Sequence, residues 1–299
     1  GLRGHNRRIE SKRHRTATPA EFLFAVFLVR LVLAVVVPFI NTIAISFSTQ
    51  REYLNTPLLL IPRKPTLNNY INLLRDKRIS IGYLTSLKIL LLGLPINLFL
   101  TVSLAYGTSR KNYPGKRLIL GAILFTMLFN GGILPLYLQM RELHLTNTIW
   151  SVILASGINV FYFVLARNYF CSLPEALIDS AQLDGAGEWK ILFSIILPIS
   201  KPILATLTLF YMVDRWNEWY NALIFIHDNS IIPLQVVLRS IVMESNISSN
   251  TSSAQAAVRN FDMGIKMGAV MLTSLPIMCV FPFLQKHFAK GVMVGAIKA

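Results

Sequence analysis

The sequence predicts an all-α membrane protein that crosses the bilayer about six times. Hydrophobic residues make up 54% of the 299 residues and charged residues only 14%, whereas about 25% of the residues in an ordinary soluble domain are charged. Apolar runs of about 20 residues recur along the chain, and one such run can cross a bilayer core of about 30 Å. Too little polar chain remains to cover these runs in a soluble protein, so we expect them to lie in lipid.

Six runs are long enough to span the membrane, and they set the domain organisation. The expected spans are Phe22–Ile45, Gly82–Gly107, Leu118–Met140, Thr148–Ala166, Ile203–Ile226 and Gly264–Leu284. The chain then divides into a basic N-terminal tail (1–21), one transmembrane domain (22–285) and a short C-terminal tail (286–299). The first run is long and lacks a small-residue cleavage site, so we expect it to stay as a membrane anchor rather than a cleaved signal.

The positive charge follows the expected topology of a membrane protein. A net charge of +15 could indicate nucleic-acid binding, but membrane proteins concentrate Lys and Arg in their cytoplasmic loops. With the N-terminus inside, the inner segments of this chain carry more Lys and Arg than the outer ones. We therefore expect no nucleic-acid partner, and we place both termini and the loop between the fourth and fifth spans on the cytoplasmic side.

No residue pattern indicates an enzyme, a metal site or a disulfide. The two cysteines, Cys171 and Cys279, lie in a loop and in the last span, and the five histidines are scattered without ligand spacing. No Gly-x-x-x-x-Gly-Lys-Ser/Thr phosphate loop occurs. We expect this chain to bind no metal or cofactor of its own and to have no ATP site.

A polar stretch from Ser172 to Pro202, here called the central loop, separates the fourth and fifth spans. Ser172 and Glu175 have the spacing of a capping box, and Pro174 suits a first helical turn. We expect a helix from about Pro174 that ends at Gly185 or Gly187, then a second short helix over Trp189–Leu197. Apolar side chains on such a surface loop favour a protein partner.

Several spaced motifs resemble a known family. In the central loop Asp184-Gly185-Ala186 is followed by an apolar run that ends Ile195-x-Leu197-Pro198, and the triplet before it reads Asp179-Ser180-Ala181. This resembles the EAA loop of bacterial ABC-importer permeases, with an acid one carbon shorter and a serine in place of the middle alanine. The Asn130–Pro135 run resembles an oligosaccharide branch of the carbohydrate, maltose-permease-like group, and the C-terminal Lys-Gly-x-x-x-Gly-x-x-Lys resembles its ending.

The resemblance implies the type I ABC-importer permease fold and a set of partners. These are a second homologous permease, two ATP-binding subunits that hold ATP and Mg²⁺, an extracytoplasmic solute-binding protein, an oligosaccharide and the lipid of a bacterial inner membrane. It assigns coupling to the ATPases to the central loop, at Glu175, Asp179, Ala181, Asp184, Gly185, Ala186, Trp189, Ile195, Leu197 and Pro198. It also implies an ATPase contact of the C-terminal tail, at Gly291, Gly295 and Lys298.

The fifth span carries the most polar membrane stretch. On a continuous helix Asp214, Glu218 and Asn221 share one face, and ionisable residues inside a span usually face a cavity or the bundle interior. We predict that this stretch lines the substrate path, through Asp214, Trp216, Asn217, Glu218, Trp219, Tyr220 and Asn221. The alternative is a local ion pair of Arg215 with Asp214 or Glu218. Asn97, in the second span, is expected to bond between helices rather than to bind a ligand.

The outer segment between the first two spans is rich in cations. Apolar residues at helical spacing after Pro65 predict a short amphipathic helix. Two acids, Glu52 and Asp76, face six cations, namely Arg51, Arg63, Lys64, Arg75, Lys77 and Arg78. A positive mouth concentrates anions, which favours an acidic oligosaccharide such as a uronide. Contact with the partner permease or with lipid headgroups is the alternative explanation.

Two other classes of membrane protein fit the sequence less well. An ion-coupled secondary transporter of a small polar solute predicts buried acidic pairs in several spans and an inverted repeat, whereas the acids here gather in one span. An enzyme of membrane lipids predicts a cluster of His and Asp residues, and the sequence shows none.

Overall fold

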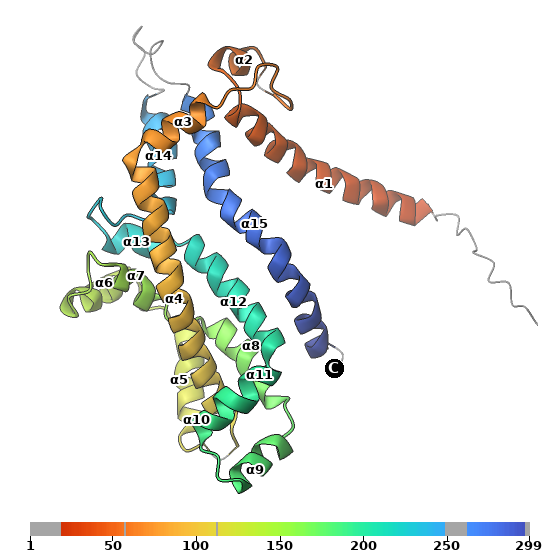
Figure 1. Ribbon diagram of the computed structural model, residues 1–299, viewed down its shortest axis with the longest axis vertical. Coiled ribbons are helices and arrows are strands. Elements are labelled where there is room, and N and C mark those ends of the chain that lie inside the picture. The colour runs from red at the N-terminus through yellow and green to blue at the C-terminus, as the bar shows by residue number, and fades with distance from the viewer. Residues whose placement is uncertain (1–18, 57, 112, 249–261, 297–299) are drawn as a thin grey trace, which may run out of the picture.

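The computed structural model describes residues 19–56, 58–111, 113–248 and 262–296, and within these ranges the regular structure is helical throughout. The elements shown in Figure 1 are α1 (Pro19–Ser46), α2 (Gln50–Asn55), α3 (Asn68–Arg75), α4 (Lys77–Ser109), α5 (Lys116–Leu128), α6 (Ile133–Glu142), α7 (Ile149–Ala155), α8 (Val160–Cys171), α9 (Ala176–Leu183), α10 (Glu188–Ile191), the π-helical turn η1 (Leu192–Ile196), α11 (Leu197–Ile199), α12 (Lys201–Trp216), α13 (Tyr220–Phe225), α14 (Leu234–Ser248) and α15 (Asp262–Ala296).

Three of the six expected spans are confirmed as long apolar helices. The stretches Ala20–Ser46, Lys77–Ser109 and Met263–Val280 are each long and apolar enough to cross a membrane. The first covers the expected first span, and the other two match the second and sixth. α15 continues to Ala296, so the expected C-terminal tail is largely a continuation of the last helix.

The other three expected spans are not straight helices. The third is divided into α5 and α6, because Gly132 takes a left-handed φ of 86° and its N–H is held by the Asn130 side chain at 2.9 Å. The fourth is the pair α7 and α8, bent by 52°. Asn159 starts α8 by accepting hydrogen bonds from the N–H groups of Phe161 and Tyr162. The fifth stops at Trp216 and resumes at Tyr220.

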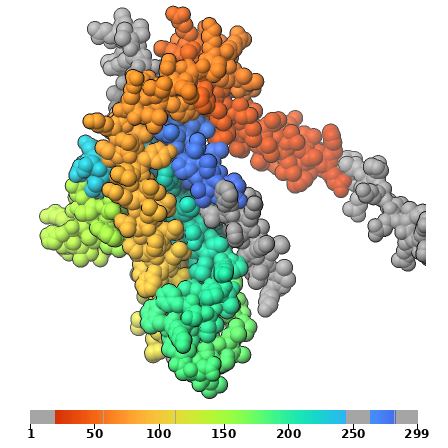
Figure 2. Space-filling view, viewed as in Figure 1, coloured from red at the N-terminus to blue at the C-terminus, as the bar shows by residue number. Residues whose placement is uncertain are grey.

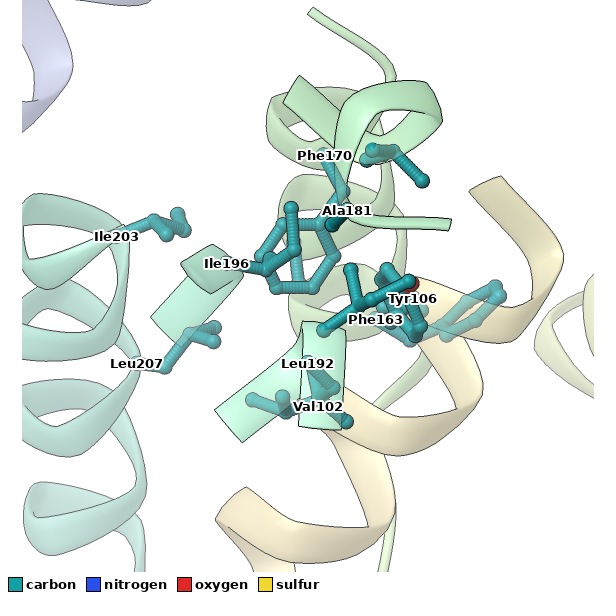
Figure 3. Close-up of a cluster of buried hydrophobic side chains, with 13 residues drawn as sticks. Val102, Tyr106, Phe163, Phe170, Ala181, Leu192, Ile196, Ile203 and Leu207 are labelled. Atoms are coloured by element: carbon teal, nitrogen blue, oxygen red, sulfur yellow. The ribbon is translucent and has the colours of Figure 1, made fainter. Parts of the chain in front are cut away.

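The largest core cluster joins the central loop to the helices above it. Figure 3 shows side chains of α4, α8, α9, η1 and α12 meeting around Phe163, which is fully buried. Burial of such side chains contributes about 1.5–3 kcal/mol each. The labelled members of the cluster are Val102, Tyr106, Phe163, Phe170, Ala181, Leu192, Ile196, Ile203 and Leu207.

The two ends of the molecule carry different segments. Figure 1 shows α9 and α10 at one end, with α2 and α3 at the opposite end. Figure 2 shows α1 projecting from the body, and the apolar window of this helix has no buried residue. The helix is anchored near its C-terminal end, where Ala44 and Ile45 pack with Leu59 and with Met263 of α15. Its exposed apolar surface therefore suits lipid or another membrane helix.

The amphipathic outer helix is confirmed as α3. Leu73 is buried on its inner side, and the Asn69 side chain donates to the carbonyls of Ser46 and Ser48 at 2.9 and 3.1 Å. These bonds satisfy carbonyls at the end of α1, which have no partner within their own helix. The helix is thereby fixed beside the C-terminal end of α1 and the N-terminal end of α4.

Candidate functional site

The central loop folds as a helix, a turn and a second helical segment. Gly185 has a φ of 76°, and no heavy atom lies within 4 Å of where its Cβ would be. This position needs glycine for its backbone conformation and not for space. Gly187, with a φ of −73°, has no such need. Of the two glycines predicted to end the first helix, Gly185 is therefore the one that makes the turn.

The capping box expected at the start of this loop does not form. The Ser172 hydroxyl donates back to the carbonyl of Tyr169 at 2.7 Å. Glu175 lies at the N-cap itself and accepts a hydrogen bond from the Lys111 ammonium at 2.6 Å. This bond to Glu175 raises the pKa of Lys111. The prediction was wrong because a cation 64 residues earlier in the chain competes for the carboxylate.

The loop buries one face and exposes another. Ala181 and Ile178 are buried in the core, and Ala186, Ile195 and Leu197 pack against it. Leu183, Trp189 and Phe193 are exposed, and the Trp189 ring stacks on Phe193 and on Phe99 of α4. Asp184 and Pro198 are also exposed. The exposed apolar residues form the surface that a partner would contact.

Glu188 joins this loop to α4, a role that no pattern in the sequence indicates. Its carboxylate accepts hydrogen bonds from the Tyr106 hydroxyl at 2.6 Å and from the Gln182 amide at 2.9 Å, and Arg110 lies 3.8 Å away. These groups, with Asp179, Glu175 and Trp189, surround a cavity of about 590 Å³ that lies between the loop and the end of α4. The second helical segment is thus bonded to the C-terminal end of α4.

A second cavity, of about 330 Å³, lies where the fifth span is interrupted, and we call it the break cavity. Because the chain from Asn217 to Trp219 is not helical, its side chains turn toward the bend between α7 and α8. The lining residues are Ser156, Ile158, Asn159, Tyr211, Asp214, Arg215, Asn217, Glu218, Trp219 and Tyr220.

The carboxylates of the break cavity already have partners. Asp214 accepts a hydrogen bond from the Tyr162 hydroxyl at 2.9 Å. Glu218 accepts from the backbone N–H and the side-chain amide of Asn221, at 3.1 and 3.2 Å. The predicted common helical face of Asp214, Glu218 and Asn221 is wrong, since the helix ends between the first two.

Two of the predicted path residues lie outside this cavity. Trp216 is buried against α15, where its indole N–H donates to the carbonyl of Thr273 at 2.9 Å. Asn221 does not line the cavity; its backbone N–H and its side-chain amide donate to the Glu218 carboxylate. The other five predicted residues line the cavity and offer it polar groups and aromatic rings: Asp214, Asn217, Glu218, Trp219 and Tyr220.

Residues 77–294 match the model of the family described as "Binding-protein-dependent transport system inner membrane component". The chain belongs to this family. It is 36% identical to Protein LplC of Bacillus subtilis over 88% of this chain and 89% of that protein. It is also 36% identical to the polygalacturonan/rhamnogalacturonan transport system permease protein YtcP of the same species, over 91% and 96%.

A solved structure confirms the permease fold. It is the crystal structure of a bacterial ABC transporter involved in the import of the acidic polysaccharide alginate. One of its chains superposes with a TM-score of 0.81 and 27% identity, covering 91% of this permease and 98% of that chain. The resemblance inferred from the EAA-type loop and the carbohydrate-permease motifs is therefore confirmed.

Arg215 of the permease is a buried anchor, and its guanidinium bonds to groups other than the Asp214 and Glu218 carboxylates named in the alternative explanation. Its guanidinium, in a side chain only 3% exposed, donates five hydrogen bonds of 2.8–3.0 Å. The acceptors are the Asn97 side-chain oxygen, the Ser156 hydroxyl and the carbonyls of Val152, Ile153 and Ser156. Carbonyls at the end of a helix lack internal partners and carry partial negative charge, so the end of α7 balances this cation.

Asn97 confirms its expected role between helices. Its amide donates to the carbonyls of Ser156 and Gly157 at 3.0 and 2.6 Å, while its oxygen accepts from Arg215. Gly93, one turn away, leaves room for this contact, since a Cβ there would lie 3.0 Å from the Arg215 Nε. The bend between α7 and α8 is therefore held by one side chain from α4 and one from α12.

The residues expected to contact the ATPases from the C-terminal tail lie at or beyond the end of the described chain. Gly291 and Gly295 lie in the last turns of α15, and Lys298 lies outside the described residues. Among the described residues, no three His, Cys, Asp or Glu side chains come together as a metal site. The predicted contact of the tail with ATPase subunits stays a prediction.

Proposed function

We propose that this permease carries an oligosaccharide across a bacterial inner membrane as one transmembrane subunit of an ATP-driven importer. The observation that carries the proposal is the break cavity. It lies within a membrane-spanning bundle and combines two carboxylates, an amide and two exposed aromatic rings. Sugar hydroxyls bind to such acceptors, and sugar rings stack on flat aromatic faces with a polar edge.

Energy for transport comes, in this proposal, from separate subunits. Two ATP-binding subunits holding ATP and Mg²⁺ dock on the exposed surface of the central loop, and a second homologous permease completes the pathway. An extracytoplasmic solute-binding protein delivers the sugar at the opposite end, near α2 and α3. Both termini then lie in the cytoplasm. The exposed Leu183, Trp189 and Phe193 support the docking surface.

Movement of the central loop would reach the break cavity through α4. Glu188 bonds the loop to Tyr106 near the inner end of this helix, and Asn97 bonds the same helix to Arg215. Closure of the ATPases would displace the loop and rock the helices, which opens the path alternately to each side.

We further propose that the oligosaccharide is acidic, of the uronide type. Arg51, Arg63, Lys64, Arg75 and Lys77 are exposed and form no ion pair with a described residue, whereas Arg78 pairs with Asp76 at 2.9 Å. These cations would steer anions to the outer mouth. The similarity to YtcP, a polygalacturonan/rhamnogalacturonan permease protein, and to a transporter involved in alginate import supports the same class.

The test is purification of the tagged permease from its own cells, followed by uptake measurements. We expect a second permease and an ATPase to co-purify, and we expect the permease alone to hydrolyse no ATP. Uptake of a uronide should fall as salt is added, because salt screens exposed charges. ATP hydrolysis by the isolated permease would contradict the importer-subunit proposal, and uptake of neutral sugars only would contradict the acidic substrate.

A further inference from the structure

Arg239 of α14 lies against the wall of the break cavity. Its guanidinium carbon is 4.3 Å from the centre of the Trp219 ring, and Trp219 lines the cavity. A guanidinium over an indole face is held there by cation–π attraction. The Arg239 side chain is exposed, and the structure records no hydrogen bond or ion pair between it and any described residue. Its five N–H donors are therefore available to a ligand.

Arg215 differs from Arg239 in that its N–H groups are all used in hydrogen bonds within the protein. Arg215 also lines the cavity, but all five of its N–H groups already bond to Asn97, Ser156 and the end of α7. It has no donor left for a substrate. Of these two guanidinium groups, Arg239 is the one able to bind a carboxylate.

The negative groups of the cavity define the side from which a carboxylate can enter. Asp214 and Glu218 line the cavity as acceptors and suit sugar hydroxyls. A carboxylate on the substrate would be repelled by both and must turn away from them. Trp219 and Tyr220 give the wall two aromatic rings without negative charge, and Arg239 contacts the first of these.

The helix that carries Arg239 is tied to the interrupted chain. Gln235 lies one helical turn before Arg239 on the same side of α14, and its amide is 3.5 Å from the side-chain oxygen of Asn217. α14 also packs on α4 and α15, and Leu234 and Val237 are buried in that contact. The Arg239 guanidinium therefore belongs to a helix that is packed in the bundle, and it lies against Trp219, which lines the break cavity.

We infer that Arg239 and Trp219 form a carboxylate subsite of the translocation path, in which Arg239 binds the carboxylate of a uronic acid residue beside the Trp219 ring. The planar fork of arginine matches a carboxylate with two parallel hydrogen bonds, which lysine cannot reproduce. This inference rests on the proposed import of an acidic oligosaccharide and names the residue that selects for it.

The test compares acidic and neutral substrates in cells that lack the chromosomal gene and carry a plasmid-borne variant. The probes are trisaccharides of galacturonic acid and of mannuronic acid, each beside its carboxyl-reduced counterpart. The variants are Arg239→Gln, Arg239→Lys and, as a matched loss of one guanidinium charge on an exposed residue of α6 that lies outside the break cavity and the steering cations, Arg141→Gln. Assembly is checked by co-purification of the ATPase.

We expect Arg239→Gln to lower uptake of the acidic trisaccharide about tenfold or more, the usual effect of losing a charge-assisted hydrogen bond, and to change uptake of the reduced trisaccharide less than threefold. Arg239→Lys should fall between Arg239→Gln and wild type, and Arg141→Gln should keep the wild-type ratio. An equal loss for both kinds of sugar, or no loss, would overturn the subsite. Wild-type cells that take up only reduced sugars, or neither kind, would instead contradict the acidic substrate itself.

Discussion

Replacement of Arg215 by methionine should destabilise the permease more than any other single change in the membrane domain described here. The substitution keeps an apolar stem of similar length but removes five hydrogen bonds. Three backbone carbonyls at the end of α7 and the oxygens of Asn97 and Ser156 would lose a donor. Each unsatisfied buried group costs about 1–3 kcal/mol.

The total should be smaller than the sum of these costs. Arg215 lines the break cavity, so water can reach some of the freed carbonyls, and Asn97 keeps its bonds to Ser156 and Gly157. We therefore expect a loss of about 3–5 kcal/mol, the range for removing one partner of a buried charged contact. Folded domains are stable by only about 5–15 kcal/mol, so the complex should assemble poorly.

Gly93→Ala tests the packing around the Arg215 side chain by a smaller change. The new methyl group would lie 3.0 Å from the Arg215 Nε and 3.3 Å from its Cδ, so we expect overpacking that costs about 1–3 kcal/mol. Gly121→Ala in α5 is the matched control, since no heavy atom lies within 4 Å of its Cβ position. Alanine should be neutral or slightly stabilising there, because glycine is the poorer helix former by about 1 kcal/mol.

The measurements are the midpoint of thermal unfolding of the purified complex and the rate of uptake. Arg215→Lys should rescue little, because an ammonium has three donors and no planar fork. Wild-type unfolding and uptake in Arg215→Met would refute the reasoning. So would equal effects of Gly93→Ala and Gly121→Ala.

Three further predictions concern the central loop and the path. Gly185→Val should cost about 1–3 kcal/mol through its φ of 76° and weaken ATPase co-purification, whereas Gly187→Val, at a φ of −73°, should not; equal effects would count against the turn. Tyr106→Phe, which removes the bond to Glu188, should lower uptake per ATP hydrolysed, unlike Tyr113→Phe on the exposed inner loop; unchanged coupling would discard this contact. In a background without Cys171 and Cys279, cysteines at Asp214 and at 217–220 should react with a soluble thiol reagent and be protected by substrate, whereas a cysteine at Trp216 should stay protected; labelling every 3–4 residues would indicate a continuous helix instead.

The sequence was sufficient wherever one local feature decides the structure. Long uninterrupted apolar runs predicted α1, α4 and α15, and helical spacing after Pro65 predicted α3. A glycine after a helix can supply a left-handed turn, which predicted a helix end at Gly185 or Gly187, and the structure has the turn at Gly185. The spaced motifs of the central loop were enough to recognise the family.

The breaks in the third, fourth and fifth spans could not be located from apolar runs in the sequence. Apolar composition reports the length of a segment and not its direction, so it predicts one span for residues 118–140 and one for residues 203–226. The bend at 156–159 is held by Arg215, about 60 residues later in the chain, and by Asn97, about 60 residues earlier. The capping box failed for the same reason, since the partner of Glu175 is the distant Lys111.

Helix α4 connects the central loop to the break cavity through two of its polar side chains. Asn97 and Tyr106 lie on one uninterrupted helix, Lys77–Ser109, about 14 Å apart along its axis at 1.5 Å per residue. Tyr106 bonds to the central loop and Asn97 to the anchor of the break cavity. Because the hydrogen bonds of a helix resist compression over this length, a shift of the loop that moves Tyr106 must also move Asn97 or break its bond to Arg215. The buried charge of the fifth span therefore lies where a movement of the central loop would be transmitted through α4.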